Sequence, residues 1–367
     1  MDRKWLAALF LLVFILALLA CGRKPGGSPA ASSAALPNLL VQADGAVWLR
    51  RAGWSGFQPA GFGVQVEPGD MLRVTQGGSA AIFCGPQSQW AENPRPLPAD
   101  GAEHGVPCQA GRPPRPMADV AALRGEKEGD IPYVLSPRDS ALLTDRPSLR
   151  WFALPGVDSY SVSVVSDDGK TRPAAPAGGG ELAWPASWPP LEPGATYVLV
   201  VSGGGRSSDE GNREHAGLAF WLLDAREAEQ VRAQEGELRG RPLSPAALDL
   251  LLAELYRGHG LRAEAAWLLE QTTTREPATV PWLNRGQLCL ETGLPAQAEE
   301  AFQQALESAR AAGDLEMQAQ ALVGWGLARR LLGDEAAARS HLQAAQALYE
   351  QLGDQSGIGQ VDRLLKP

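Results

Sequence analysis

The side chains of this chain that could do chemistry are few and widely spaced. The histidines, His104, His215, His259 and His341, stand in separate segments, and none is paired at the helical spacing of a metal site. No serine lies in a Gly-x-Ser-x-Gly sequence, and the glycines at 203–205 lack the lysine of a phosphate-binding loop. The sequence therefore predicts no metal, no cofactor and no catalytic residues, and we expect a protein that is not an enzyme.

Cys21 is the cysteine whose position in the sequence predicts a covalent modification of its thiol. It follows a short basic start and an unbroken apolar run that ends at Ala20. This run is at the short limit for a membrane span and fits the apolar part of a secretion signal. The ending Leu18-Leu19-Ala20-Cys21 resembles the lipobox of bacterial lipoproteins. The alternative is an uncleaved signal anchor with an incidental cysteine.

The lipoprotein resemblance implies a location. In that family the signal, here 1–20, is removed and the cysteine, here Cys21, carries acyl chains. The small and polar residues of 21–38 are typical of a flexible tether. We therefore expect a protein anchored by lipid to a bacterial membrane and facing the extracytoplasmic side, in the periplasm or at the cell surface.

The composition restricts the partners. The chain has 367 residues and a formal net charge of −9, which argues against nucleic-acid binding because that function requires a basic face. This length allows two or three domains beyond the signal and tether.

The remaining cysteines have structural interpretations. Cys84 and Cys108 lie in one glycine- and proline-rich region, and outside the cytoplasm we expect them to form a disulfide, the alternative being two thiols. Cys289 lies in an apolar helical pattern and is expected to be a small core residue.

The region 39–112 has the pattern of a small β-domain. Short apolar runs alternate with the turn signals Glu67-Pro68-Gly69-Asp70 and Gln76-Gly77-Gly78-Ser79. The order of strand, Pro-Gly-Asp-x-Leu-Arg-Val and Gly-Ser-Ala-Ala-Ile resembles the FecR-type β-domain. A proline- and charge-rich linker, 113–131, follows.

The region 132–224 is predicted to be a β-sandwich. The run Ser161-Val162-Ser163-Val164 alternates polar and apolar residues, as a half-buried strand does. The phrase from Leu191 to Tyr197, LEPGATY, resembles the fibronectin type III signature, and Trp151 stands where that family has a buried tryptophan. A connecting helix or linker, 225–243, is expected next.

The C-terminal region, 244–367, repeats itself with a helical period. Small residues recur at 253, 286 and 326 and again at 265, 298 and 338, where two antiparallel helices can cross closely. The pattern resembles the tetratricopeptide repeat (TPR), and we expect a final capping helix near the C-terminus. The predicted fold class is therefore multidomain, all-β followed by an all-α TPR-type array.

The TPR resemblance implies a binding surface. That family binds protein segments along the concave face made by the first helix of each pair. The corresponding residues here are Glu254, Arg257, Gln287, Leu290, Glu291, Leu327, Arg330 and Leu331. The alternative is an array that stacks against its own sandwich or associates with a second copy.

Two functions follow from these expectations. The first is a lipid-anchored, non-catalytic scaffold that binds an unidentified protein partner through its repeats. The second is an envelope protein that contacts carbohydrate or peptidoglycan through its β-domains, using exposed aromatic side chains. Most tryptophans in these domains are, however, expected in the cores, and only the cluster Trp184 to Trp188 lies in a predicted loop.

Overall fold

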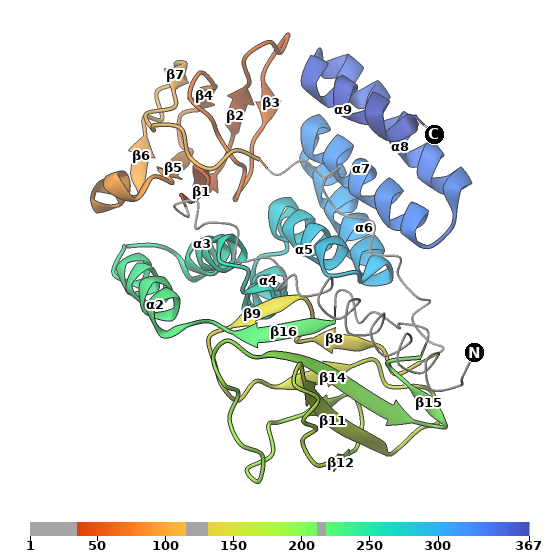
Figure 1. The fold of residues 1–367 in the computed structure, drawn as a ribbon. Helices are drawn as coiled ribbons and strands as arrows, with labels where there is room; N and C mark the ends of the chain where they lie inside the picture. Colours follow the sequence, from red (N-terminus) through yellow and green to blue (C-terminus); the bar gives the residue numbers. More distant parts are fainter. Residues whose placement is uncertain (1–34, 115–130, 211–217, 367) are drawn as a thin grey trace, which may run out of the picture. The chain divides into compact units, whose positions relative to one another are not determined.

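The structure, a computed structural model, describes residues 35–114, 131–210 and 218–366. Two β-rich regions come first and a helical array follows, so the predicted multidomain order of β then α is confirmed (Figure 1). The signal, most of the tether, Cys21 and most of the 113–131 linker lie outside the described residues.

The first β-region contains two small antiparallel sheets. One has the order β1-β5-β6 and the other β3-β2-β4-β7. Their strands are β1 (Leu39–Asp44), β2 (Val47–Arg50), β3 (Gln58–Pro59), β4 (Met71–Val74), β5 (Ser79–Phe83), β6 (Arg95–Leu97) and β7 (His104–Gly105). A short 3₁₀ helix, Gln87–Glu92, buries Trp90 beside Phe83. Residues 64–66, a short Val-Gln-Val run before the turn at Glu67–Asp70, form only an isolated bridge from Gln65 to Leu39.

The turns of this region explain why glycine and proline stand between its short strands. Asp70 donates its N–H to the carbonyl of Glu67, and Gly69 between them has φ +99°, a conformation that glycine adopts without a Cβ penalty. Cys84 and Cys108 are joined in a disulfide, which closes the loop between β5 and the segment after β7.

The second β-region has two sheets that share one core. The smaller sheet has the order β13-β10-β8, and the larger has the order β12-β11-β14-β16-β9, with β15 paired to β14. The strands are β8 (Val134–Ser136), β9 (Ser140–Leu142), β10 (Leu149–Trp151), β11 (Tyr160–Ser166), β12 (Ala175–Ala177), β13 (Glu181–Leu182), β14 (Thr196–Gly203), β15 (Arg206–Ser207) and β16 (Ala219–Leu222). All ladders are antiparallel except β16 with β9. The core includes Trp151, Tyr160 and Phe220.

The LEPGATY phrase forms a buried turn before β14. Leu191 and Tyr197 are both 3% exposed, and the Tyr197 hydroxyl accepts a hydrogen bond from the Glu192 N–H at 2.9 Å. The leucine and the tyrosine therefore hold the turn onto the core through both packing and a hydrogen bond.

The helices follow the predicted repeats. They are α2 (Ala225–Arg239), α3 (Pro245–Gly258), α4 (Arg262–Arg275), α5 (Thr279–Glu291), α6 (Pro295–Ala312), α7 (Leu315–Leu331), α8 (Glu335–Leu352) and α9 (Gln355–Leu365). The pairs α3/α4, α5/α6 and α7/α8 form the array, and α9 packs against α8 as the expected last helix. The helix α2 occupies the region expected to connect sandwich and repeats.

Recurring Gly-Asp pairs set the helix boundaries. Gly313 and Gly353 close α6 and α8 in the left-handed conformation. The aspartate that follows each of them caps the next helix: Asp314 accepts a hydrogen bond from the Met317 N–H, and Asp354 accepts one from the Gly357 N–H. One dipeptide thus ends one helix and begins another.

Small residues allow close crossing inside the pairs. A Cβ on Gly286 would lie 2.8 Å from the ring of Phe302, which is fully buried. A Cβ on Gly326 would lie 3.0 Å from Leu342. The recurring glycines are therefore required by packing, as the sequence pattern predicts.

The β-regions share their cores with the helices. Val64 and Val66 of the first β-region belong to the same buried cluster as Val280 and Leu283 of α5. At the second β-region, the Ala141 N–H of β9 donates to the carbonyl of Gly260 just before α4. The array therefore packs on its own sandwich, and it also packs on the first β-region.

Candidate functional site

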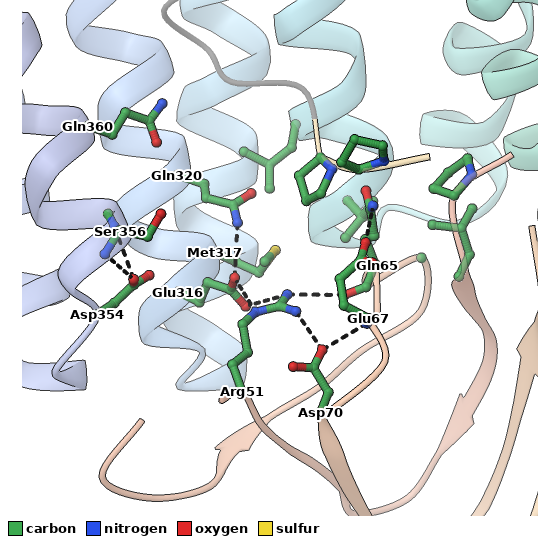
Figure 2. Close-up of a pocket in the computed structure, with 18 of the residues that line it drawn as sticks. Arg51, Gln65, Glu67, Asp70, Glu316, Met317, Gln320, Asp354, Ser356 and Gln360 are labelled. Atoms are coloured by element: carbon green, nitrogen blue, oxygen red, sulfur yellow. Dashed lines mark hydrogen bonds and ion pairs between the residues drawn. The ribbon is translucent and has the colours of Figure 1, made fainter. Parts of the chain in front are cut away.

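The candidate site is a cavity of about 650 Å³ at the concave side of the array. Residues of α3, α5, α7 and α9 form one wall, and residues of the first β-region form the other (Figure 2). The side chains predicted to receive a partner therefore face a space that this chain partly fills itself.

A buried ion-pair network closes one end of the cavity. The Arg51 guanidinium, from the first β-region, donates to both carboxylate oxygens of Glu316 on α7 at 2.7 and 3.0 Å (Figure 2). It also donates to Asp70 at 2.9 Å and to the carbonyl of Gln65 at 3.1 Å. Such bidentate pairing fixes orientation as well as charge, so Arg51 holds the β-region to α7.

Asp314 adds a titratable group to this network. It is 5% exposed, and burial, reinforced by the neighbouring Glu316, raises its pKa to about 7. The hydrogen bond from Met317 and the charge of Arg51 oppose this shift. Part of the site therefore changes its charge near neutral pH.

A second network lies at the α3 and α5 end. Arg257 on α3 donates to Glu254 at 2.9 Å and to Glu291 at 2.7 Å. Arg112, from the first β-region, forms an ion pair with Glu254 and donates to its backbone carbonyl at 3.2 Å. Asn284 of α5 also donates to Glu254, at 3.2 Å. The acidic part of this wall is thus balanced by two arginines.

Amide side chains also line the cavity. Gln287 and Asn284 come from α5, Gln320 from α7 and Gln360 from α9. Figure 2 shows Gln320 and Gln360 on neighbouring helices of the cavity wall. Because an amide can both donate and accept, this lining is suited to the backbone of an extended peptide.

The eight residues expected on the concave face have different positions. Glu254, Arg257 and Gln287 line the cavity, and Glu291 joins them through Arg257. Leu290 is fully buried in the core, and Leu327 and Leu331 are partly buried against it. Arg330 pairs with Glu335 and donates to the carbonyl of Leu364. The structure therefore brings three of the eight to the cavity, and Glu291 contacts one of these three.

Arg51, Glu316 and Gln320 are site residues that the sequence did not predict. Arg51 and Glu316 are 265 positions apart, and nothing in either local pattern indicates the other. Asp70 was recognised only as part of a turn.

The β-region tryptophans do not form an exposed platform. Trp54, Trp90, Trp151, Trp184 and Trp188 are all at most 9% exposed. Trp48 is partly buried in β2. The loop cluster instead packs internally, because Trp184 and Trp188 meet edge to face with centroids 5.2 Å apart.

Two further features concern membranes and metals. None of the helices in the described part of the chain has both the length and the apolarity needed to cross a membrane. Within 35–114, 131–210 and 218–366, no three His, Cys, Asp or Glu side chains gather as a metal site would require.

Comparison with known proteins identifies the helical array. Residues 278–351 match the tetratricopeptide repeat family, and no curated protein matches the chain. The protein is therefore a multidomain protein with β-rich regions followed by a helical array. The match covers the helices α5 to α8 of this array, and tetratricopeptide repeats generally mediate binding to protein partners.

Solved structures give weaker likenesses. The N-terminal domain of stress-induced protein-1 (STI-1) from C. elegans is 15% identical over 39% of this chain and 99% of that chain, with a TM-score of 0.27. A β-1,2-glucanase from Parabacteroides distasonis is 13% identical over 89% of this chain and 49% of that chain, with a TM-score of 0.21. At these TM-scores neither likeness supports an argument about fold or function.

Proposed function

We propose that this protein is a non-catalytic scaffold, held to a bacterial membrane by lipid on Cys21, that binds an extended segment of a protein partner in the cavity of its TPR array. The observation that carries the proposal is the cavity itself. Its wall is made by the first helices of the repeats, and amide side chains remain beside two ion-pair networks.

The β-regions have a supporting role in this proposal. The first, FecR-like in its sequence order, narrows the concave groove and holds α7 through Arg51. The second, fibronectin type III-like, supports the array at α4 through the hydrogen bond from Ala263 to Ser140. Together they would present the groove at a fixed distance from the membrane.

A site-specific crosslink tests partner binding. A photoreactive amino acid replaces Gln360, which lines the cavity, in full-length protein in native membranes. The matched control carries the same group at Arg339, which is exposed on α8. We expect a discrete crosslinked protein at position 360 that is absent at 339. Equal products at both positions, or none at 360, would contradict binding in the cavity.

The anchor is tested separately. Cys21→Ser is expected to abolish fatty-acid labelling and to release the protein from membranes, because one residue then loses all of its acyl chains. Retention of this variant in the membrane would contradict lipid anchoring but would leave the crosslinking result intact.

The alternative function, carbohydrate contact by the β-region tryptophans, is not supported, because those side chains are buried or, at Trp48, partly buried. We therefore retain the scaffold as the proposed function.

A further inference from the structure

A second cavity, of about 730 Å³, lies on the other side of the array from the groove residues just described. Its walls are the β8–β10 part of the second β-region and the helices α4, α5 and α6. This volume falls within the range of small-ligand pockets, which is roughly 300–1,000 Å³. We propose that this cavity binds a pyranose sugar, with Trp267 and Phe152 as the stacking residues.

Both exposed aromatic side chains lie at this cavity. Among the described residues, Trp267 (56% exposed) and Phe152 (38%) are the large apolar side chains left exposed, and both line it. Trp267 comes from α4 and Phe152 follows β10, so two separate elements contribute them. Exposed apolar surface gathered at one concave site is typical of binding rather than of a folding core.

The polar lining matches a ligand that has many hydroxyl groups. Arg150 and Glu270 form an ion pair at 3.1 Å, yet each side chain is 41% exposed and so remains accessible to a ligand. Arg285 packs on the ring of Trp282 and makes no ion pair with another described residue. These groups supply both planar donors and planar acceptors beside the aromatic rings.

Glu264 supplies a further acceptor at the wall. Its Oε1 accepts a hydrogen bond from the Leu143 N–H at 2.9 Å. Its Oε2 is buried and has no partner among the described residues. A buried polar atom normally has a partner, and a ligand hydroxyl can provide one only when a change of the Glu264 rotamer brings this oxygen to the cavity surface. Burial also raises the pKa of Glu264 to about 7, so near neutrality this carboxyl can donate as well as accept.

These groups favour a sugar over other ligands of the same size. The C–H face of a pyranose is slightly positive and packs on the negative face of an aromatic ring, while its hydroxyls reach the surrounding polar groups. An acyl chain would remove the half-exposed Arg150–Glu270 pair from water and offer it no further hydrogen bond, which is costly. A proline-rich peptide could also stack on Trp267 and is therefore included in the test.

The test uses saturation-transfer-difference NMR and calorimetry on the full-length protein in detergent. The probes are cellobiose, maltose, N,N′-diacetylchitobiose and digalacturonic acid, with a decaproline peptide as the competing class. We expect at least one disaccharide to bind with its ring protons against the protein, and the peptide not to bind. Binding of the peptide alone, or of no disaccharide at millimolar concentration, overturns the proposal.

Variants locate the binding. Trp267→Ala is expected to weaken the affinity at least tenfold, whereas Trp267→Tyr keeps a ring and should stay within about threefold. Because Trp267 is largely exposed, its replacement should leave the fold intact, which circular dichroism checks. Arg339→Ala on α8 is the surface control and should bind as the wild type does. Unchanged affinity in Trp267→Ala overturns the assignment of the site.

Discussion

Asp314 is a buried carboxyl whose protonation is coupled to the folding of the array. Its carboxylate caps α7 and lies near Glu316 and Arg51, and its pKa rises from an ordinary value near 3.8 to about 7. Between these pH values the folded chain binds a proton that the unfolded chain does not bind. The contribution of Asp314 to the free energy of unfolding therefore increases as pH falls through this window, by about 1.4 kcal/mol per pH unit.

Asp314→Asn tests this linkage, because asparagine also caps a helix but does not ionise. We expect the variant to gain stability relative to the wild type at pH 7.5 and to lose that advantage progressively as the pH falls from 7 towards 4. Urea unfolding at several pH values measures the difference. The pKa of Glu264 is raised in both proteins, so its contribution to the pH dependence of stability cancels in the comparison. A difference that stays constant across pH would show that Asp314 keeps an ordinary pKa.

Arg51 is the residue on which the contact between the first β-region and α7 depends. Arg51→Met would leave Asp70 and Glu316, which are 4% and 7% exposed, without their common cation. Breaking a buried pair in this way costs about 3–5 kcal/mol. We expect a loss of this size in urea unfolding.

The double variant Arg51→Met/Glu316→Met provides the control. It removes one of the two stranded carboxylates, so it should recover part of the loss, and the two changes should not be additive. If the double variant loses the sum of the two single losses, the pair does not act as a unit.

At the scale of the element, helix crossing depends on glycines whose replacement can be compared directly. Gly286→Ala places a Cβ 2.8 Å from the buried ring of Phe302, and overpacking of this kind costs about 1–3 kcal/mol. Gly236→Ala in α2 meets no heavy atom within 4 Å and should instead stabilise by about 0.5–1 kcal/mol. Thermal unfolding of the two variants should show shifts of opposite sign. Equal shifts would mean that helix propensity, not packing, determines the outcome at position 286.

The elements were also what the sequence predicted best. The three helical pairs and the turns at Gly69 and Gly77 follow from local patterns, because helix caps, turn conformations and small-residue crossings involve neighbours in sequence. For 225–243 a helix and a linker both remained open, and the structure has the helix Ala225–Arg239. Short strands were less certain: residues 64–66 have strand-like composition but pair only at Gln65.

The candidate site was predicted only in part, for a physical reason. Glu254, Arg257 and Gln287 were found because the repeat fixes which helix face they occupy. Arg51 and Arg112 cover that face but lie far from it in the sequence. A local sequence pattern carries no information about which distant residues they contact. Trp267 was not predicted as a site residue, because helical periodicity does not distinguish an exposed aromatic side chain from a core residue on a neighbouring face.

At the scale of the whole molecule, shared cores imply shared stability. One buried cluster joins the first β-region to α5, and another joins Leu36, Phe83 and Trp90 to α2, α3 and α4. A Cβ on Gly63 would lie within about 3 Å of Leu250 and Val280, so the β-region backbone itself approaches the helices closely. The apolar surface on each side would be exposed to water if the other side unfolded first, at roughly 25 cal/mol per Å².

We therefore expect the described regions to unfold together. Differential scanning calorimetry of the full-length protein should show one dominant transition, with a van't Hoff enthalpy close to the calorimetric enthalpy. Arg51→Met weakens the contact between the β-region and α7 and should lower or split this transition, whereas Gly236→Ala, which touches nothing, should raise it without splitting. Separate transitions in the wild type would mean that the β-regions and the array are independent modules, and a partner could then bind the array by displacing the first β-region. A single transition favours binding in the existing cavity, because the concave face opens fully only when the whole molecule unfolds.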